Sequence, residues 1–215
     1  MSDTMTFREM NLAVFRGEPL PHVLFQPRIE PWYDWHRLFN QMPPAYADMT
    51  IQAFFDDLDV SMRYVHYYTG MPNPVVDSFL PEVTIREHFE GVTGWRTYET
   101  PHGDLTEKLH MTPDQTWRTV DFAVKTRDDL RSLRWLYEHR VYAFSPAHFA
   151  QGSAFVGDRG EPQFWVPRSP YQALALDWMR YETFIYALAD YPQDLAATFE
   201  VIDRSYDGLY EQLCA

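Results

Sequence analysis

Cysteine is almost absent from this sequence: its 215 residues include only Cys214. One cysteine excludes a disulfide bond within the chain and a cysteine-rich zinc site built from this chain alone. Long apolar runs are also missing, because no stretch approaches the roughly 20 apolar residues that a membrane span requires. Charged residues from Asp3 to Glu18 interrupt the start of the chain, which excludes the apolar core of a signal peptide. We therefore expect a cytoplasmic protein with no membrane partner.

Basic residues are few: 18 lysines and arginines stand against 31 acidic residues, for a formal net charge of −13. Such a charge repels phosphate backbones, so we expect no nucleic-acid partner. Glycine-rich phosphate loops are missing too, since Gly91-x-x-Gly94 and Gly157-x-x-Gly160 match neither a P-loop nor a dinucleotide fingerprint. The acidic balance is explained most simply by solubility.

Helices are predicted from capping signals and apolar spacing. Apolar residues make up 46% of the chain and aromatic residues 17%, which is enough for a packed core. Thr6-x-x-Glu9 forms a capping box that predicts a helix over 6–16, ended by Gly17. Further helices are predicted over 34–41, 50–58 and 126–140, and along an amphipathic stripe from Leu195 to Leu213.

Strands are predicted over three short apolar segments, 22–25, 60–65 and 164–166. A β-hairpin is predicted over 93–111, because residues typical of strands flank the turn cluster Pro101-His102-Gly103, and 116–124 would extend it. Strands that alternate with helices indicate an α/β fold.

Two of the predicted strands end in proline and arginine, at Arg28 and Arg168, and a helix follows each. Ligands of α/β barrels and open α/β sheets bind at the carboxyl ends of strands, so both arginines are candidate ligand contacts. A surface arginine after a strand is the alternative. Glu30 is a candidate general base or an ion-pair partner of Arg28. The Trp-rich stretch 32–35 either packs in the core or faces a ligand.

Six stretches follow one another along nearly the whole chain: FREMNLAVFRGEPLPHVLF, QPRIEPWYDWH, ETPHGDLTEK, VDFAVKTRDDLRSL, PRSPYQAL and FIYALADYPQDL. This ordered set resembles the uroporphyrinogen decarboxylase superfamily, which also contains methyltransferases that move methyl groups between corrinoid proteins and thiols or methoxylated substrates. It implies a (β/α)8 barrel longer than this chain. We therefore expect residues 1–215 to form one incomplete TIM-type barrel domain, the N-terminal half, with a hairpin inserted around 93–124. Exposed edges of such a half barrel favour a homodimer.

The decarboxylase motif of the superfamily is only partly kept. Arg-Gln-Ala-Gly-Arg-Tyr aligns with residues 28–33, so Arg28 and Tyr33 match, Trp32 replaces the second arginine, and Glu30 is an added acid. In the decarboxylase, paired arginines hold the acidic side chains of the porphyrinogen. Losing one arginine and gaining a carboxylate disfavours a polyanion, whereas Trp32 suits a flat aromatic ligand.

Two further positions differ from the decarboxylase pattern. The aspartate that faces the pyrrole nitrogens in that family aligns with His66, and a neutral imidazole cannot replace its charge. The later family tyrosine aligns with Leu176, although Tyr171 lies nearby in the sequence. Both departures favour the methyltransferase branch.

The resemblance therefore implies an enzyme of corrinoid-linked methyl transfer or O-demethylation that acts on a small methylated substrate with a corrinoid protein as partner. Porphyrinogen decarboxylation and an inactive half-barrel that serves as a binding module are the alternatives. Zinc in the methyltransferases is held by one His and two Cys, so we expect no metal in this chain and zinc ligands only beyond residue 215. The candidate site residues are, for catalysis, Arg28, Glu30 and His66, and, for substrate binding, Trp32, Tyr33, Arg168 and Tyr171.

Overall fold

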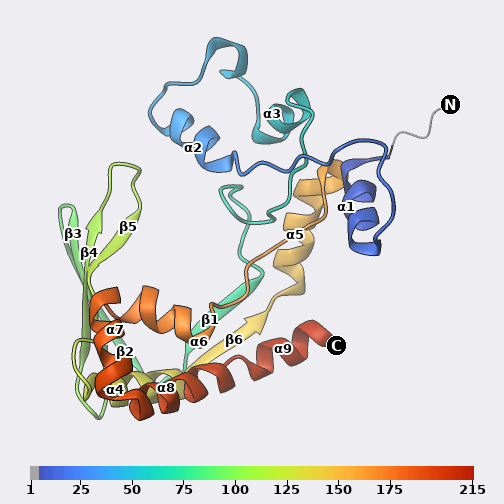
Figure 1. The fold of residues 1–215 in the computed structure, drawn as a ribbon. Helices are drawn as coiled ribbons and strands as arrows, with labels where there is room; N and C mark the ends of the chain where they lie inside the picture. Colours follow the sequence, from blue (N-terminus) through green and yellow to red (C-terminus); the bar gives the residue numbers. More distant parts are fainter. Residues whose placement is uncertain (1–4) are drawn as a thin grey trace. The chain divides into compact units, whose positions relative to one another are not determined.

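The computed structural model describes residues 5–215 and is mixed α/β, with 44% helix and 19% strand. The chain divides into two compact units (Figure 1). The first unit comprises the chain up to Val75 together with Ser145–Trp165, and the second comprises Val76–Phe144 together with Val166–Ala215. Whether the two units belong to one larger domain stays a prediction.

The first unit is mainly helical. Its first helix, predicted from the capping box, is confirmed: the Thr6 hydroxyl accepts from the Glu9 amide, and Gly17 ends the helix with φ of 69°. The helices predicted over 34–41 and 50–58 are also present, with shifted bounds. The elements of this unit are α1 (Phe7–Arg16), α2 (Glu30–Leu38), the 3-10 turn η1 (Pro44–Tyr46), α3 (Ile51–Asp57), α5 (Pro146–Val156) and the 3-10 turn η2 (Gly157–Arg159).

The strand predicted over 22–25 is wrong, so Arg28 does not follow a β-strand. Val23 is 87% exposed, and the Phe25 carbonyl accepts a backbone hydrogen bond from the Ser61 amide. Prolines at 21 and 27 remove amide donors on both sides of the segment, which leaves too few groups for a ladder.

The strands predicted over 60–65 and 164–166 are also wrong. The 60–65 segment nevertheless lies beside residues 159–163, which directly precede 164–166. Tyr64 and Gln163 form an isolated parallel bridge, and the Met62 amide donates to the Arg159 carbonyl. Pro162, which has no amide proton, interrupts the pairing before a strand develops. The first unit therefore contains parallel chain segments without regular strands.

The core of the first unit lies between α2, α3 and the 60–65 segment. Its buried members are Tyr33, Ile51, Phe54, Phe55, Val60, Met62, Val65 and Val156. Two glycines let the backbone approach this core. A Cβ on Gly152 would lie 2.4 Å from the Val65 Cβ, and one on Gly160 would lie 1.6 Å from the Met62 carbonyl oxygen. Side chains at these two positions would force the segments apart.

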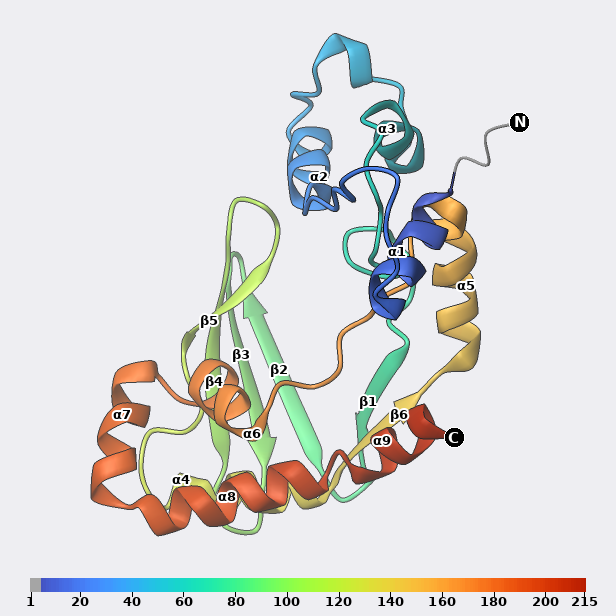
Figure 2. The ribbon, with the colours of Figure 1, turned by 45° about the vertical axis from the view of Figure 1, so that its right-hand side comes forward.

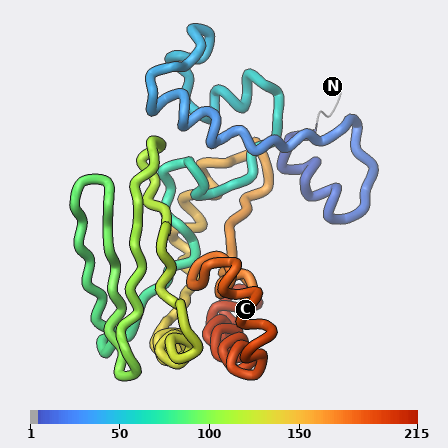
Figure 3. The backbone as a smooth tube through the Cα atoms, turned by 60° about the vertical axis from the view of Figure 1, so that its left-hand side comes forward, coloured from blue at the N-terminus to red at the C-terminus, as the bar shows by residue number. Residues whose placement is uncertain are grey.

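The second unit contains two antiparallel sheets. The larger is a meander in the order β2-β3-β4-β5, visible as successive hairpins in Figure 3. The smaller pairs β1 with β6, as the hydrogen bond from the Leu80 amide to the His139 carbonyl indicates. The strands are β1 (Val75–Phe79), β2 (Thr84–Glu90), β3 (Thr93–Glu99), β4 (Leu105–Met111), β5 (Trp117–Asp121) and β6 (Arg140–Phe144).

The predicted hairpin is confirmed as β3 and β4, joined across Pro101-His102-Gly103, and β5 extends it. The sequence did not reveal β2. All seven of its residues are exposed, so it lacks the apolar alternation that marks a strand with one buried face. The Gly91 turn, with φ of 58°, joins β2 to β3.

In the second unit, α4 packs against β4 and α8, α9 packs against β6, and α6 and α7 pack against α8 (Figure 2). The predicted helix over 126–140 is confirmed as α4, which buries Leu130, Leu133, Leu136 and Tyr137. The C-terminal stripe forms α8 and α9. The helical elements are α4 (Asp129–Glu138), α6 (Pro170–Ala173), the π-helical turn η3 (Leu174–Trp178), α7 (Tyr181–Asp190), α8 (Pro192–Arg204) and α9 (Asp207–Cys214).

No closed barrel is formed by residues 5–215, and both sheets are small and antiparallel. The α/β class is therefore confirmed only in its coarse form. In the same range, no helix combines the length and the apolar character that crossing a membrane would require.

Candidate functional site

The segment that leads into α2 lies beside an apolar hollow of about 400 Å³ in the first unit. Pro31 occupies the first turn of α2, where a missing amide proton costs nothing, and it fixes the direction of the chain between Ile29 and Trp32. The hollow is lined by Pro27, Arg28, Ile29, Trp32, Tyr46, Phe54 and Leu58. Its walls are thus apolar and aromatic, with one charged side chain.

Trp32 supplies a partly exposed wall of the hollow. Its ring is stacked on Phe54, with centroids 5.5 Å apart and planes inclined by 10°, and the centroid of the His36 ring lies 4.0 Å from its own. The side chain is 37% exposed. A ring fixed in this way offers an edge and part of a face to a flat ligand.

Arg28 is held by Tyr67. Its Nη2 donates a hydrogen bond to the Tyr67 hydroxyl, and its guanidinium carbon lies 4.6 Å from the centroid of the Tyr67 ring. That hydrogen bond raises the pKa of Arg28 above its ordinary value, so the group is always charged. Among the ion pairs of residues 5–215, none involves Arg28. The cation is oriented by a neutral group and remains available to an anion.

Glu30 is completely buried next to this hollow. Its side chain has no exposed surface, and neither carboxylate oxygen accepts a hydrogen bond from a described residue. Burial raises the pKa of Glu30, and the charges of Arg63 and Arg28 and the nearby amides of residues 29 and 30 oppose this shift only in part. The carboxyl group is therefore easier to protonate than an ordinary glutamate.

Arg63 is the second cation that acts on Glu30. Its guanidinium carbon lies 4.5 Å from the centroid of the Tyr64 ring, and its buried Nε finds no acceptor among the described residues. Tyr64 is buried and stacks on Trp165 at 4.9 Å. Arg63 thus resembles Arg28, because a tyrosine ring rather than a carboxylate holds each of them.

His66 lies in the same segment as Arg63 and Tyr67. Its Nδ1 is buried without a hydrogen-bond partner in the described chain, and burial lowers its pKa. The ring is therefore neutral at neutral pH. Among the described residues, no hydrogen bond or ion pair joins His66 to Arg28 or Glu30.

The remaining predicted site residues lie elsewhere. Tyr33 packs in the core of the first unit, and its hydroxyl donates to the Met49 carbonyl at 2.5 Å. Arg168 and Tyr171 belong to the second unit, where Arg168 pairs with Asp177 at 3.2 Å and the Tyr171 ring packs on Phe184. In the first unit, Arg28 and Trp32 line one hollow and Glu30 lies between them in the sequence.

Sequence reasoning missed several residues of this site. Arg63 and Tyr67 lie in the stretch RYVHYY (63–68), in which only His66 was singled out. The available signal was an arginine next to several aromatic residues within this stretch of six. Such groups readily form cation–π contacts, so the stretch could have been predicted to hold an oriented cation. Tyr46 and Phe54 gave no signal, because a lone aromatic residue most often belongs to a core.

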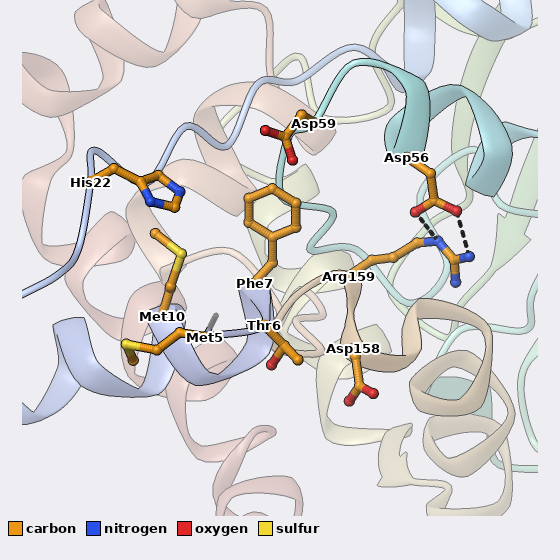
Figure 4. A pocket seen from close by; sticks show the side chains of 9 residues that line it. All are labelled: Met5, Thr6, Phe7, Met10, His22, Asp56, Asp59, Asp158 and Arg159. Carbon is orange, nitrogen blue, oxygen red and sulfur yellow. Dashed lines mark hydrogen bonds and ion pairs between the residues drawn. The ribbon is translucent and has the colours of Figure 1, made fainter. Parts of the chain in front are cut away.

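A second hollow of the first unit, of about 530 Å³, lies beside α1 (Figure 4). Its largest charged group, Arg159, already forms two hydrogen bonds of 2.7 Å with Asp56. Phe7 and the methionines Met5 and Met10 supply apolar walls. Among the described residues that line it, none is an unpaired arginine or lysine and none is a buried acid, so we regard the hollow at Arg28 as the stronger candidate site.

A third hollow, of about 450 Å³, lies in the second unit beside β2 and β3 and contains two arginines. Arg140 pairs with Asp77, while Arg96 pairs with Glu87 at 2.6 Å and with Glu107 at 3.2 Å. These cations are neutralised by their neighbours. Their ion pairs link neighbouring strands, so neither guanidinium is an unpaired cation for a ligand.

No group of three His, Cys, Asp or Glu side chains suited to a metal ion is found among residues 5–215. Comparison of the chain with family models, with curated proteins and with solved structures found no match. The geometry of the hollow at Arg28 and the residues around it therefore carry the functional argument.

Proposed function

We propose that this chain binds a small methylated aromatic substrate as part of an enzyme of the uroporphyrinogen decarboxylase superfamily, active in corrinoid-linked methyl transfer or O-demethylation. One observation carries the proposal. The hollow beside α2 combines aromatic walls with a single unpaired guanidinium, that of Arg28. A methoxylated aromatic ring with one carboxylate has matching chemistry.

The size of the hollow supports a single ring. Ligand pockets commonly span about 300–1,000 Å³, and the hollow at Arg28 has about 400 Å³. A substituted benzene fits such a volume, whereas a tetrapyrrole requires a larger one. Trp32 and Phe54, whose rings stack on each other, give this edge of the hollow the flat aromatic surface that such a ring would contact.

The charge of the hollow supports a monoanion. A porphyrinogen with many carboxylates requires several cations, because each buried carboxylate needs a partner of opposite charge. Among residues 5–215, Arg28 is the one cation that lines the hollow. Trp32 occupies the position where the decarboxylase motif carries a second arginine.

The chain traces of the first unit support an incomplete (β/α)8 barrel as the architecture. Phe25, the 61–65 segment and Gln163 are joined in succession by backbone hydrogen bonds, and the Tyr64–Gln163 bridge is parallel. Parallel pairing of neighbouring segments, as at the Tyr64–Gln163 bridge, is the arrangement of a barrel wall. We propose that these segments correspond to wall strands that are irregular here.

The residues of this chain do not fit a zinc site. Cys214 is the single cysteine and is exposed, and the described residues contain no cluster of ligands. No step through zinc is therefore derived. The corrinoid partner would supply the methyl acceptor, while the residues of this chain bind and orient the substrate: Arg28 fixes its carboxylate and Trp32 its ring plane.

Isothermal titration calorimetry with para-methoxybenzoate tests the proposal. We expect binding by the unmodified chain, weakened several-fold by Trp32→Ala. The matched control is Trp35→Ala, which removes a similarly exposed indole from the same helix but outside the hollow. Equal losses in both variants, or no binding, would overturn the proposal. Release of CO2 from uroporphyrinogen would instead establish the decarboxylase alternative.

A further inference from the structure

Three charged side chains around the hollow are coupled without forming an ion pair. Arg28 and Arg63 each lie over a tyrosine ring, and both lower the pKa of Glu30 through their charges. Yet none of the three takes part in an ion pair within the described chain, whereas two other arginines of the same unit do. The two arginines therefore influence the Glu30 carboxylate through their charges without an ion pair to it among the described residues.

Together with the amides of residues 29 and 30, these two cations favour the ionised form of Glu30. Its side chain has no exposed surface, and its carboxylate accepts no hydrogen bond from the described residues, so it is shielded from water. A buried carboxylate of this kind takes a proton whenever the opposing positive charge is weakened. The carboxylate of a ligand bound to Arg28 would weaken it in this way.

We propose that Glu30 takes up a proton from solvent when an anionic ligand pairs with the guanidinium of Arg28. The inference rests on the proposed function, since it places the carboxylate of the substrate at Arg28. The ligand brings one negative charge into the site, and protonation of Glu30 removes one. Binding of a monoanion then leaves the total charge of the site unchanged, which is favourable where solvent screening is weak.

The neighbouring titratable groups do not replace Glu30 in this role. The Tyr67 hydroxyl already accepts a hydrogen bond from Arg28, and His66 is neutral because burial lowers its pKa. On α3, which packs against α2, Asp56 is paired with Arg159. Glu30 is the group whose protonation state responds to a change at Arg28.

Isothermal titration calorimetry in several buffers at one pH measures the number of protons taken up on binding. The heat of binding para-methoxybenzoate is plotted against the ionisation enthalpy of each buffer, and the slope gives the protons taken up. We expect uptake of a fraction of a proton, at most about one, which disappears in Glu30→Gln. Glu18→Gln, a change at an exposed glutamate of the same unit, is expected to keep it. The uncharged methyl ester of the same ligand is expected to bind without uptake.

The outcomes separate this inference from the proposed function. Binding without proton uptake, or with uptake that persists in Glu30→Gln, would overturn the inference and leave the proposed function standing. Absence of binding would overturn both. Where Glu30→Gln does not fold, carbon-13 NMR of the glutamate carboxyl groups in the unmodified chain decides. One carboxyl resonance with a raised pKa should titrate at still higher pH in the presence of the ligand, and an unchanged titration would refute the inference.

Discussion

The guanidinium carbon of Arg28 lies 4.6 Å from the ring centroid of Tyr67, and its Nη2 donates a hydrogen bond to the hydroxyl of the same residue. The two contacts fix the direction of the cation without neutralising it. An arginine that is oriented in advance loses less entropy when it binds a carboxylate.

Tyr67→Phe removes the hydrogen bond to Arg28 but keeps the ring. We expect the affinity for para-methoxybenzoate to fall by about 3-fold to 10-fold, because a hydrogen bond to a charged group contributes roughly 1.5–3 kcal/mol and less where it is exposed. Tyr67→Leu should cost more, since it also removes the cation–π contact. Titration calorimetry of both variants measures the difference. Unchanged affinity in both would show that Tyr67 does not position Arg28.

Glu30→Gln should stabilise the folded chain at neutral pH. Because burial raises the folded pKa of Glu30 above its unfolded value, the stability it contributes is complete below about pH 4 and is lost as the pH rises through the raised pKa. Replacing the carboxyl group removes this loss. Thermal melts from acid to neutral pH should show a Tm advantage of the variant that grows with pH. A constant difference across the range would contradict the predicted ionisation.

His66→Gln should change the pH dependence of stability in the opposite sense to Glu30→Gln. Since burial lowers the folded pKa of His66, its stabilising contribution is present above about pH 6.5 and is lost as the pH falls through the lowered pKa. We expect the variant to lose less stability than the unmodified chain on acidification through that window. Urea unfolding at several pH values measures this effect, and parallel curves for the two proteins would count against a buried neutral imidazole.

Gly160→Ala should destabilise the first unit by about 1–3 kcal/mol, because the new methyl group would overlap the Met62 carbonyl oxygen and force two chain segments apart. The control is Gly208→Ala in α9, where a Cβ meets no atom within 4 Å. That change should stabilise the chain by about 0.5–1 kcal/mol through helix propensity. Chemical denaturation of both variants gives the comparison. Equal stability of the two would show that Gly160 is not a close-approach position.

Local signals predicted the helices well, and the strands much less well. The capping box at Thr6 and Glu9 predicted α1 because both halves of that interaction lie within one turn. The 22–25 and 60–65 segments have apolar sequences, but a strand requires partners elsewhere in the chain. Proline at position 162 and prolines around Phe25 limit that pairing. The edge strand β2 was missed for the converse reason, since its pairing with β3 needs no apolar face.

The candidate site was predictable where its residues are consecutive. Arg28, Glu30 and Trp32 were found because they lie within five residues of one another and differ from a known motif. Arg63 could not be connected to Glu30 from the sequence, because the chain between them passes through α2 and α3 before it returns. Burial of Glu30 was equally hidden, since a glutamate in the first turn of a helix is ordinarily exposed.

The location of the ligand tests the central claim most directly. Transferred or isotope-filtered NOEs between the methoxy and ring protons of para-methoxybenzoate and the protein should identify the Trp32 indole and the side chains of Phe54 and Leu58, which line the hollow. NOEs to these side chains, absent when Arg28 is replaced by Gln, are the predicted result. NOEs confined to Trp35, Trp165 or the second unit, with none to Trp32, would contradict the account.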